Sequence, residues 1–190
     1  MRIIAGRAKG RRLATPKGRD TRPTTDRVRE AVFSIVTAWA GGGGEAGLAG
    51  LSFLDLYAGS GAMALEAASR GAAPAVAVES SKAAAALIGR NAAAAGLALE
   101  VAARPVEQYL ARTGRPFDVV WADPPYALPD EALAGVLDRL AHGGWLADEA
   151  LVAVERSARG PGPVWPRALA GYDIRRFGET SVHLAVFSEG

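Results

Sequence analysis

The sequence predicts an α/β fold: a doubly wound, mostly parallel sheet of seven strands with an antiparallel hairpin at its C-terminal end. From residue 51 onward, short apolar segments alternate with segments of helical length, and glycines close several of these helices. Towards the C-terminus the alternation breaks, because two β-type segments follow each other across a short turn. Alternating strands and helices form parallel sheets with right-handed crossovers, whereas consecutive strands form hairpins. At 190 residues the chain is long enough for one such domain with a small extension.

Each element has a local reason in the sequence. Strands are expected where aliphatic residues run together, and helices where Ala-rich or amphipathic segments end at a glycine such as Gly71 or Gly96. The expected strands are 51–57, 75–78, 97–102, 117–122, 151–154, 172–177 and 181–187. The expected helices between them are 62–69, 81–95, 106–111 and 130–140. Residues 160–166 are rich in proline and glycine and are expected to be irregular.

A further helix is expected before the sheet. Thr24–Thr25–Asp26 marks its start, and an apolar stripe then recurs at helical spacing, formed by Val28, Val32, Ile35, Val36 and Trp39. The glycines at 41–44 end this helix and begin a flexible linker. The expected organisation is therefore a small basic N-terminal extension with its helix (1–40), a Gly-rich linker (41–50) and the main domain (51–190).

Charge is distributed unevenly along the chain. Residues 1–30 carry ten Lys/Arg and three Asp/Glu, a net charge of +7, while the other 160 residues carry 12 basic and 17 acidic residues, a net charge of −5. Clustered cations favour a nucleic-acid partner because they displace the counterions condensed on phosphates, although a merely solvated charged terminus is an open alternative. Glycines and prolines predict that the arm is looped or hairpin-like. The candidate RNA-binding residues are Arg2, Arg7, Lys9, Arg11, Arg12, Arg22, Thr24 and Arg27.

Composition excludes several other classes of protein. The chain has no cysteine, so disulfides and Cys-ligated metals are excluded, and His142 and His183 show no ligand spacing. No apolar run approaches the roughly 18 residues of a membrane span, and the charged first residues lack the apolar stretch of a secretory signal. We expect a cytoplasmic protein without a bound metal or a membrane partner. Nothing in the sequence demands an interface, so a monomer is expected.

The first chemical motif is Asp55–Gly61, between the first strand and its helix. Glycines there let the backbone pass close to a ligand, and a helix start favours electron-rich groups. Gly59, Gly61 and Ala64 also match the dinucleotide pattern G-x-G-x-x-G/A, so an NAD-dependent oxidoreductase is one candidate.

Asp55 argues against a dinucleotide. A carboxylate four residues before the first glycine would repel a pyrophosphate, but it suits an ammonium group such as that of S-adenosylmethionine. Glu79 ends the second strand and can accept hydrogen bonds from ribose hydroxyls. Either carboxylate alone is more often a capping or surface group, but at two successive strand ends the pair favours ligand binding. The candidate cofactor-binding residues are Asp55, Tyr57, Ala58, Gly59, Ser60, Gly61, Glu79 and Ser80.

The second chemical motif is Asp123–Pro124–Pro125–Tyr126, directly after the fourth strand and expected beside the end of the first. Its two prolines form a rigid turn without N–H groups, which leaves the Asp123 carboxylate and the Pro124 carbonyl as acceptors. Two acceptors converging on an NH₂ group would direct its nitrogen lone pair towards a sulfonium methyl group. Tyr126 offers a flat face to a flipped base. A Pro-rich loop with a capping Asp is the alternative for a shorter match. These four residues are the candidate catalytic residues of an S-adenosylmethionine-dependent methyltransferase that acts on an exocyclic amino group of a nucleic-acid base, with S-adenosylhomocysteine as product.

At these residues the chain resembles the amino-methyltransferases of the class I Rossmann-like fold, whose motif is Asp/Asn-Pro-Pro-Tyr/Phe/Trp. More narrowly, it resembles the RsmD family of bacterial 16S rRNA guanine-N2 methyltransferases over essentially the whole chain. The matching positions are 2–6, 10–13, 22–30, 55–61, 65–67, 69–71, Glu79, Asn91 and 123–126. The segment 22–30, Arg-Pro-Thr-Thr-Asp-Arg-Val-Arg-Glu, is the most discriminating, since many methyltransferases share the other two motifs.

The resemblance implies methyl transfer to N2 of one guanine in 16S rRNA, with guanine 966 as the expected target. The expected substrate is the small ribosomal subunit or a late assembly intermediate. Carried over to this chain, Asp55, Gly59, Gly61 and Glu79 bind the cofactor. Asp123 and Tyr126 hold the guanine, and the basic arm contacts RNA.

One position departs from the family pattern. Related enzymes usually place an Asp or Asn after the third strand to contact the adenine amino group, whereas this chain has Ala103–Arg104–Pro105. Arg104 cannot accept that hydrogen bond, so a backbone carbonyl or a neighbouring side chain is expected to accept it. Arg104 is kept as a candidate cofactor contact.

Other functions remain open at this stage. A DNA adenine or cytosine amino-methyltransferase would share both motifs, but it usually needs an additional segment to read the major groove, for which this chain has little room. A non-catalytic RNA-binding assembly factor could keep the fold without the chemistry, although the intact motifs argue against it. An oxidoreductase leaves Asp123–Tyr126 unexplained.

Overall fold

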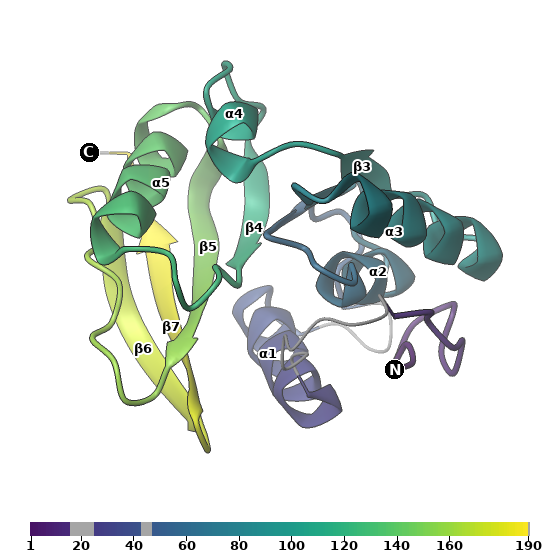
Figure 1. The fold of residues 1–190 in the computed structure, drawn as a ribbon. Coiled ribbons are helices and arrows are strands. Elements are labelled where there is room, and N and C mark those ends of the chain that lie inside the picture. The colour runs from purple at the N-terminus through teal and green to yellow at the C-terminus, as the bar shows by residue number, and fades with distance from the viewer. Residues whose placement is uncertain (16–24, 43–46, 190) are drawn as a thin grey trace.

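A seven-stranded sheet lies at the centre of the protein (Figure 1). The computed structural model describes residues 1–15, 25–42 and 47–189. The strands are β1 Phe53–Leu56, β2 Ala75–Val78, β3 Glu100–Ala102, β4 Phe117–Ala122, β5 Leu146–Ser157, β6 Leu169–Phe177 and β7 Thr180–Phe187. They lie in the order β3-β2-β1-β4-β5-β7-β6, with β1 to β5 parallel and β7 antiparallel to both of its neighbours. The predicted doubly wound sheet with an antiparallel C-terminal hairpin is confirmed.

Helices cover both faces of this sheet. They are α1 Asp26–Trp39, α2 Ala62–Ser69, α3 Lys82–Ala95, α4 Val106–Leu110 and α5 Asp130–His142. Successive strand residues point to opposite faces, so Leu54 and Leu56 pack with α4 and α5 while Phe53 packs with α1 and α2. The carboxyl ends of β1, β2 and β4 therefore lie between the two helical layers, at the edge of the sheet where doubly wound folds bind their ligands.

Five strands differ from their predicted bounds: β1 and β7 begin within two residues of their predicted starts, whereas β3, β5 and β6 begin three or more residues away. β3 begins at Glu100 because Leu97 is buried in a small core under the N-terminal residues instead of joining the sheet. β5 begins at Leu146, earlier than predicted. The prediction missed its first residues because the exposed Asp148 and Glu149 interrupt the apolar pattern of the strand. β6 begins at Leu169 and carries a register shift between Gly171 and Asp173.

The helix predicted before the sheet is α1. The Thr25 hydroxyl accepts a hydrogen bond from the Val28 amide at 3.3 Å, which caps the first turn. The predicted stripe faces inward: Val28, Val32 and Val36 are buried, together with Phe33. Further along, Leu48 is fully buried in the same core. No helix within the described ranges is long and apolar enough to span a bilayer.

Candidate functional site

Asp55 lies at the end of β1, almost completely buried. Its Oδ2 accepts a hydrogen bond from the Ala64 amide at 3.1 Å, in the first turn of α2. The carboxylate therefore satisfies one of the free N–H groups that begin a helix, the capping role that the sequence left open. The same contact fixes α2 relative to β1, so the loop 57–61 between them has a defined path.

The two glycines of this loop have different structural reasons. Gly61 has φ +75°, and a Cβ there would lie 2.7 Å from the Ile88 side chain, so glycine permits α2 and α3 to pack closely. Gly59 has φ +55°, and a Cβ there would meet only the Tyr57 carbonyl oxygen at 3.9 Å. The space beside Gly59 is open, which is the condition for a ligand to approach the loop backbone.

Glu79 joins the end of β2 to the glycine loop. Its Oε2 accepts from the Gly59 amide at 2.8 Å, and its Oε1 accepts from the Ser81 amide at 2.7 Å and, more weakly, from the Ser80 hydroxyl at 3.5 Å. Because a carboxylate offers about four lone-pair sites, these contacts leave acceptor capacity for the hydroxyls of a ribose. Glu79 can therefore hold the loop and a ribose together.

Three further loop residues have identifiable contacts. Tyr57 has φ +63°, unusual for a bulky residue, and its hydroxyl lies 3.5 Å from Glu107 Oε1 on α4. Burial and the Glu107 charge raise the pKa of Tyr57. The Ala58 amide donates to the Val78 carbonyl of β2 at 2.9 Å, and the Ser60 hydroxyl lies 3.6 Å from the Met1 sulfur.

Asp123 lies beside this loop, as predicted. Its amide donates to the Leu56 carbonyl at 3.3 Å, which joins the end of β4 to the end of β1. Burial above all, and then the negative charges of Asp123 and Glu79, raise the pKa of Asp55 well above its usual range, against the opposing effect of the Ala64 amide. Three carboxylates from three strand ends thus share one site with excess negative charge, which suits a cationic ligand.

The rest of the tetrapeptide forms a tight turn at the rim of the site. Pro124 is buried, and the Pro125 carbonyl accepts from the Leu128 amide at 2.8 Å. Tyr126 is 68% exposed, which is high for an aromatic side chain that nothing in the fold requires at the surface. An exposed ring three residues after Asp123 is available for stacking.

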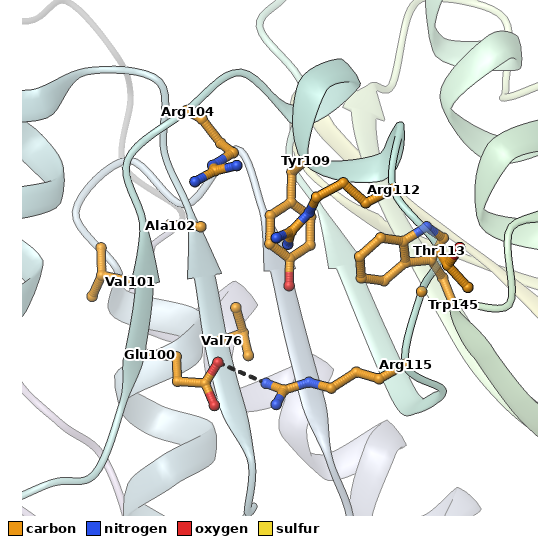
Figure 2. A pocket seen from close by; sticks show the side chains of 11 residues that line it. Val76, Glu100, Val101, Ala102, Arg104, Tyr109, Arg112, Thr113, Arg115 and Trp145 are labelled. Carbon is orange, nitrogen blue, oxygen red and sulfur yellow. Dashed lines mark hydrogen bonds and ion pairs between the residues drawn. The ribbon is translucent and has the colours of Figure 1, made fainter.

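Arg104 lies close to Glu79 along the backbone, because the amides of both residues donate to the Ala102 carbonyl, at 3.0 and 3.1 Å. The Arg104 side chain borders a pocket of about 480 Å³ that lies along β3, and the lining of this pocket does not include the glycine loop or Asp123 (Figure 2). Figure 2 also shows Arg112, whose guanidinium lies 5.2 Å from the Tyr109 ring centre, and the Arg115–Glu100 ion pair at 2.8 Å. A contact between Arg104 and an adenine stays a prediction.

The first residues of the arm form a hairpin, as predicted. Arg2 pairs with Arg12 in an antiparallel bridge, and the Ile3 amide donates to the Arg11 carbonyl at 3.0 Å. The exposed candidate RNA-binding residues are Arg2, Arg7, Lys9, Arg11, Arg12 and, on α1, Arg27. Arg22 and Thr24 lie outside the described residues. Contact of these residues with RNA stays a prediction.

Sequence reasoning assigned no role to two buried charges, Arg29 on α1 and Glu66 on α2. The signal was present: Glu66 is the one charged residue of α2, whose eight residues are all buried. A carboxylate in such a helix needs partners. Glu66 lies 4.0 Å from the Arg29 guanidinium and 2.9 Å from that of Arg70.

Known proteins resemble the chain over nearly its whole length. Residues 1–186 match the family described as Conserved hypothetical protein 95. The ribosomal RNA small subunit methyltransferase D of Escherichia coli K12 is 38% identical over 168 residues, covering 87% of this chain and 79% of that protein. The solved structure of the Escherichia coli protein yhhF is 32% identical with a TM-score of 0.86, covering 99% of this chain and 98% of the other.

A more distant structure shares the fold alone. An RNA methyltransferase from Salinibacter ruber, solved with S-adenosyl-L-homocysteine, is 17% identical with a TM-score of 0.66 and covers 88% of this chain and 95% of its own. The predicted Rossmann-like class I methyltransferase fold is therefore confirmed. With the match over residues 1–186 and the identity to methyltransferase D, the chain belongs to the Conserved hypothetical protein 95 family, the RsmD family whose motifs its sequence carries.

Proposed function

We propose that this protein transfers a methyl group from S-adenosylmethionine to the exocyclic N2 of a guanine in 16S rRNA, with guanine 966 as the expected position. The observation that carries the proposal is the convergence of Asp55, Glu79 and Asp123 at adjacent strand ends, with Tyr126 exposed in the turn that follows Asp123. Membership of the family supports an rRNA substrate, because its curated relative is named for one.

The residues at the site fit the cofactor. The open space beside Gly59 admits a ligand to the backbone, Glu79 retains acceptor capacity for ribose hydroxyls, and the buried Asp55 favours a cation. When bound, the cofactor supplies an electrophilic methyl group. These features do not fit a pyrophosphate, which would face the Asp55 carboxylate, so an oxidoreductase is not favoured.

The tetrapeptide Asp123–Tyr126 acts on the substrate side. The Asp123 carboxylate and the Pro124 carbonyl accept hydrogen bonds from the amino group and hold its nitrogen in line for attack. The Tyr126 ring stacks on the flipped guanine. As the nitrogen gains the methyl group it loses one proton, which passes to a carboxylate or to water.

The partner is expected to be the small ribosomal subunit or a late assembly intermediate, with the enzyme acting as a monomer in the cytoplasm. The exposed cations of the hairpin and of α1 would neutralise RNA phosphates near the site. The family match weighs against a DNA substrate, and the intact substrate-side motif Asp123–Tyr126 weighs against a non-catalytic assembly factor.

The test is to incubate the protein with labelled S-adenosylmethionine and undermethylated small subunits, naked rRNA or duplex DNA, and to identify the methylated nucleoside by mass spectrometry. We expect N2-methylguanosine from the ribosomal substrate. Methylated DNA would replace the proposal with the DNA enzyme, and bound cofactor without any product would replace it with the assembly factor.

A further inference from the structure

The N-terminal hairpin (residues 1–13) is docked on the body of the protein and lies beside α2 and α3 (Figure 1). Its apolar residues Ile3, Ala8 and Leu13 are buried, in a small core shared with residues of both helices. The hairpin therefore has an apolar side against the helices, while its five cations remain exposed.

Two side chains of α2 bind the hairpin backbone. Glu66 accepts hydrogen bonds from the Ile4 amide at 2.7 Å and the Ala5 amide at 2.9 Å. Ser69 accepts from the Ala8 amide at 3.0 Å and donates to the Ala5 carbonyl at 2.6 Å. These bonds satisfy backbone groups that have no strand partner of their own.

Asn91 on α3 holds the chain just beyond the hairpin. Its side-chain oxygen accepts from the Ala14 amide at 3.0 Å, and its side-chain nitrogen donates to the Ala14 carbonyl at 2.9 Å. Asn91 thus bonds both backbone groups of one residue, as a neighbouring strand would do. Neither Asn91 nor Ser69 has a contact that cofactor binding would explain.

Gly6 shows how closely the hairpin approaches α2. A Cβ on Gly6 would lie 2.0 Å from the Ser69 carbonyl oxygen, so only glycine fits here. Gly10, in the same hairpin, has a similar φ of +81°, compared with +77° for Gly6, but a Cβ there would meet nothing within 4 Å. The two glycines share a positive φ and differ in their surroundings.

The hairpin also reaches the cofactor loop and α1. Met1 contacts the Ser60 hydroxyl through its sulfur at 3.6 Å, and Arg29 donates from Nη2 to the Arg2 carbonyl at 2.6 Å. The exposed cations are therefore held at a fixed place relative to the loop that would carry the methyl donor.

We propose that Gly6, Glu66, Ser69 and Asn91 are positioning residues that hold the N-terminal hairpin as a preformed cationic surface for the phosphates of the RNA substrate. This proposal rests on the proposed function, because it gives these residues a role only if RNA is the substrate. A surface that is ordered before binding avoids the entropic cost of ordering it on the RNA. Displacing the hairpin should therefore weaken RNA binding while leaving the chemical step and the cofactor site unchanged.

The sharpest test compares Gly6→Ala with Gly10→Ala. Both substitutions place a side chain at positive φ and cost about the same backbone strain, but only Gly6→Ala collides with α2. We expect Gly6→Ala to raise KM for the ribosomal substrate by about tenfold and to change kcat and the cofactor Kd by less than about twofold. Gly10→Ala should change KM by less than about threefold. Equal KM values for the two variants would overturn the proposal, as would a matching loss of cofactor affinity in Gly6→Ala.

A second test measures the docking of the hairpin directly. Asn91→Ala should speed hydrogen exchange at the Ala14 amide by about tenfold, because two hydrogen bonds are lost, and should raise KM for the ribosomal substrate. Gln108→Ala, which removes an exposed amide side chain on α4, is the control. Faster exchange with an unchanged KM would overturn the proposal while leaving the methyltransferase assignment intact. The proposed function is tested separately, with the wild-type protein alone. If the wild type methylates no rRNA, the proposed function itself is overturned.

Discussion

The Asp55 carboxylate both caps a helix and titrates abnormally. It caps α2 through the Ala64 amide, and burial together with Asp123 and Glu79 raises its pKa. In the cofactor-free protein the folded state therefore binds a proton more tightly at this group than the unfolded chain does. The group favours folding at low pH, and that contribution is lost as pH rises from the unfolded pKa of about 4 through the raised folded value.

Asp55→Asn should remove this pH dependence. The amide oxygen can still accept from Ala64, but no buried charge forms as the pH rises. We expect the free energy of unfolding of the cofactor-free variant, measured by urea titration, to decline less between pH 5 and pH 8 than that of the wild type. Asp148→Asn, at an exposed position, is the control and should keep the wild-type decline. An undiminished decline in Asp55→Asn would assign the pH dependence to other groups.

Asp123→Ala separates chemistry from cofactor binding. Loss of the carboxylate removes one acceptor for the amino group, and we expect kcat to fall by about 10²-fold or more if positioning dominates. Cofactor affinity should be nearly intact, because the residues assigned to the cofactor are Asp55, the glycine loop and Glu79, all of which remain. Single-turnover kinetics and calorimetric titration with the cofactor measure the two quantities. A parallel loss of cofactor affinity would contradict the assigned role.

At the scale of elements, α1 joins the predicted arm to the main core. Phe33 is fully buried, stacks on Phe53 at 5.8 Å between ring centres, and lies under the Arg70 guanidinium at 4.9 Å. The helix that follows the basic hairpin is thus bound to the sheet through its apolar face. The apolar stripe at helical spacing predicted α1 correctly because the residues of that stripe pack against the sheet.

Phe33→Ala should destabilise the whole protein. Removing a buried Phe side chain costs about 3–5 kcal/mol, and because α1 shares its core with β1 and β4 we expect one cooperative transition in urea. Ser34→Ala, on the exposed side of the same helix, should change stability by less than about 0.5 kcal/mol. A separate early transition for α1, with the main transition unmoved, would show that the helix is an independent unit.

The sequence predicted most elements because their signals are local. Strands buried on both faces read as aliphatic runs, whereas the first part of β5 contains Asp148 and Glu149 at exposed positions and gave no such signal. The carboxylates of the site were predictable for a related reason. In a doubly wound fold the ends of neighbouring strands meet, so Asp55, Glu79 and Asp123 could be brought together before any distance was known.

The contacts of the hairpin could not be predicted in that way. Gly6 and Ser69 are distant in sequence, and the need for glycine comes from the approach of two backbones. Nothing in the local pattern around Asn91 indicates that it bonds Ala14. The family match marked these positions without giving a reason, which only the packing of the hairpin supplies.

At the scale of the whole molecule, positive charge is concentrated in the first residues and the body is mildly acidic. Arg27, exposed on α1, belongs to the positive part. Arg27→Gln should weaken RNA binding and reduce the slope of log K against log salt concentration by about one unit if it contacts one phosphate. Arg139→Gln, exposed on α5, serves as the matched control. An unchanged slope in Arg27→Gln would give this residue a purely structural role, and Arg22 carries the same expectation.

The shortness of α2 has a consequence for how the family can vary. Its eight residues receive the Asp55 contact at Ala64 and hold the hairpin at Glu66 and Ser69. Each helical residue adds about 100° of rotation and 1.5 Å of rise. One inserted or deleted residue between Ala64 and Glu66 would turn the hairpin contacts about a quarter of the way around the helix. A change in the length of α2 would therefore break either the Asp55 contact or the hairpin contacts, so both sets of contacts fix the length of this helix.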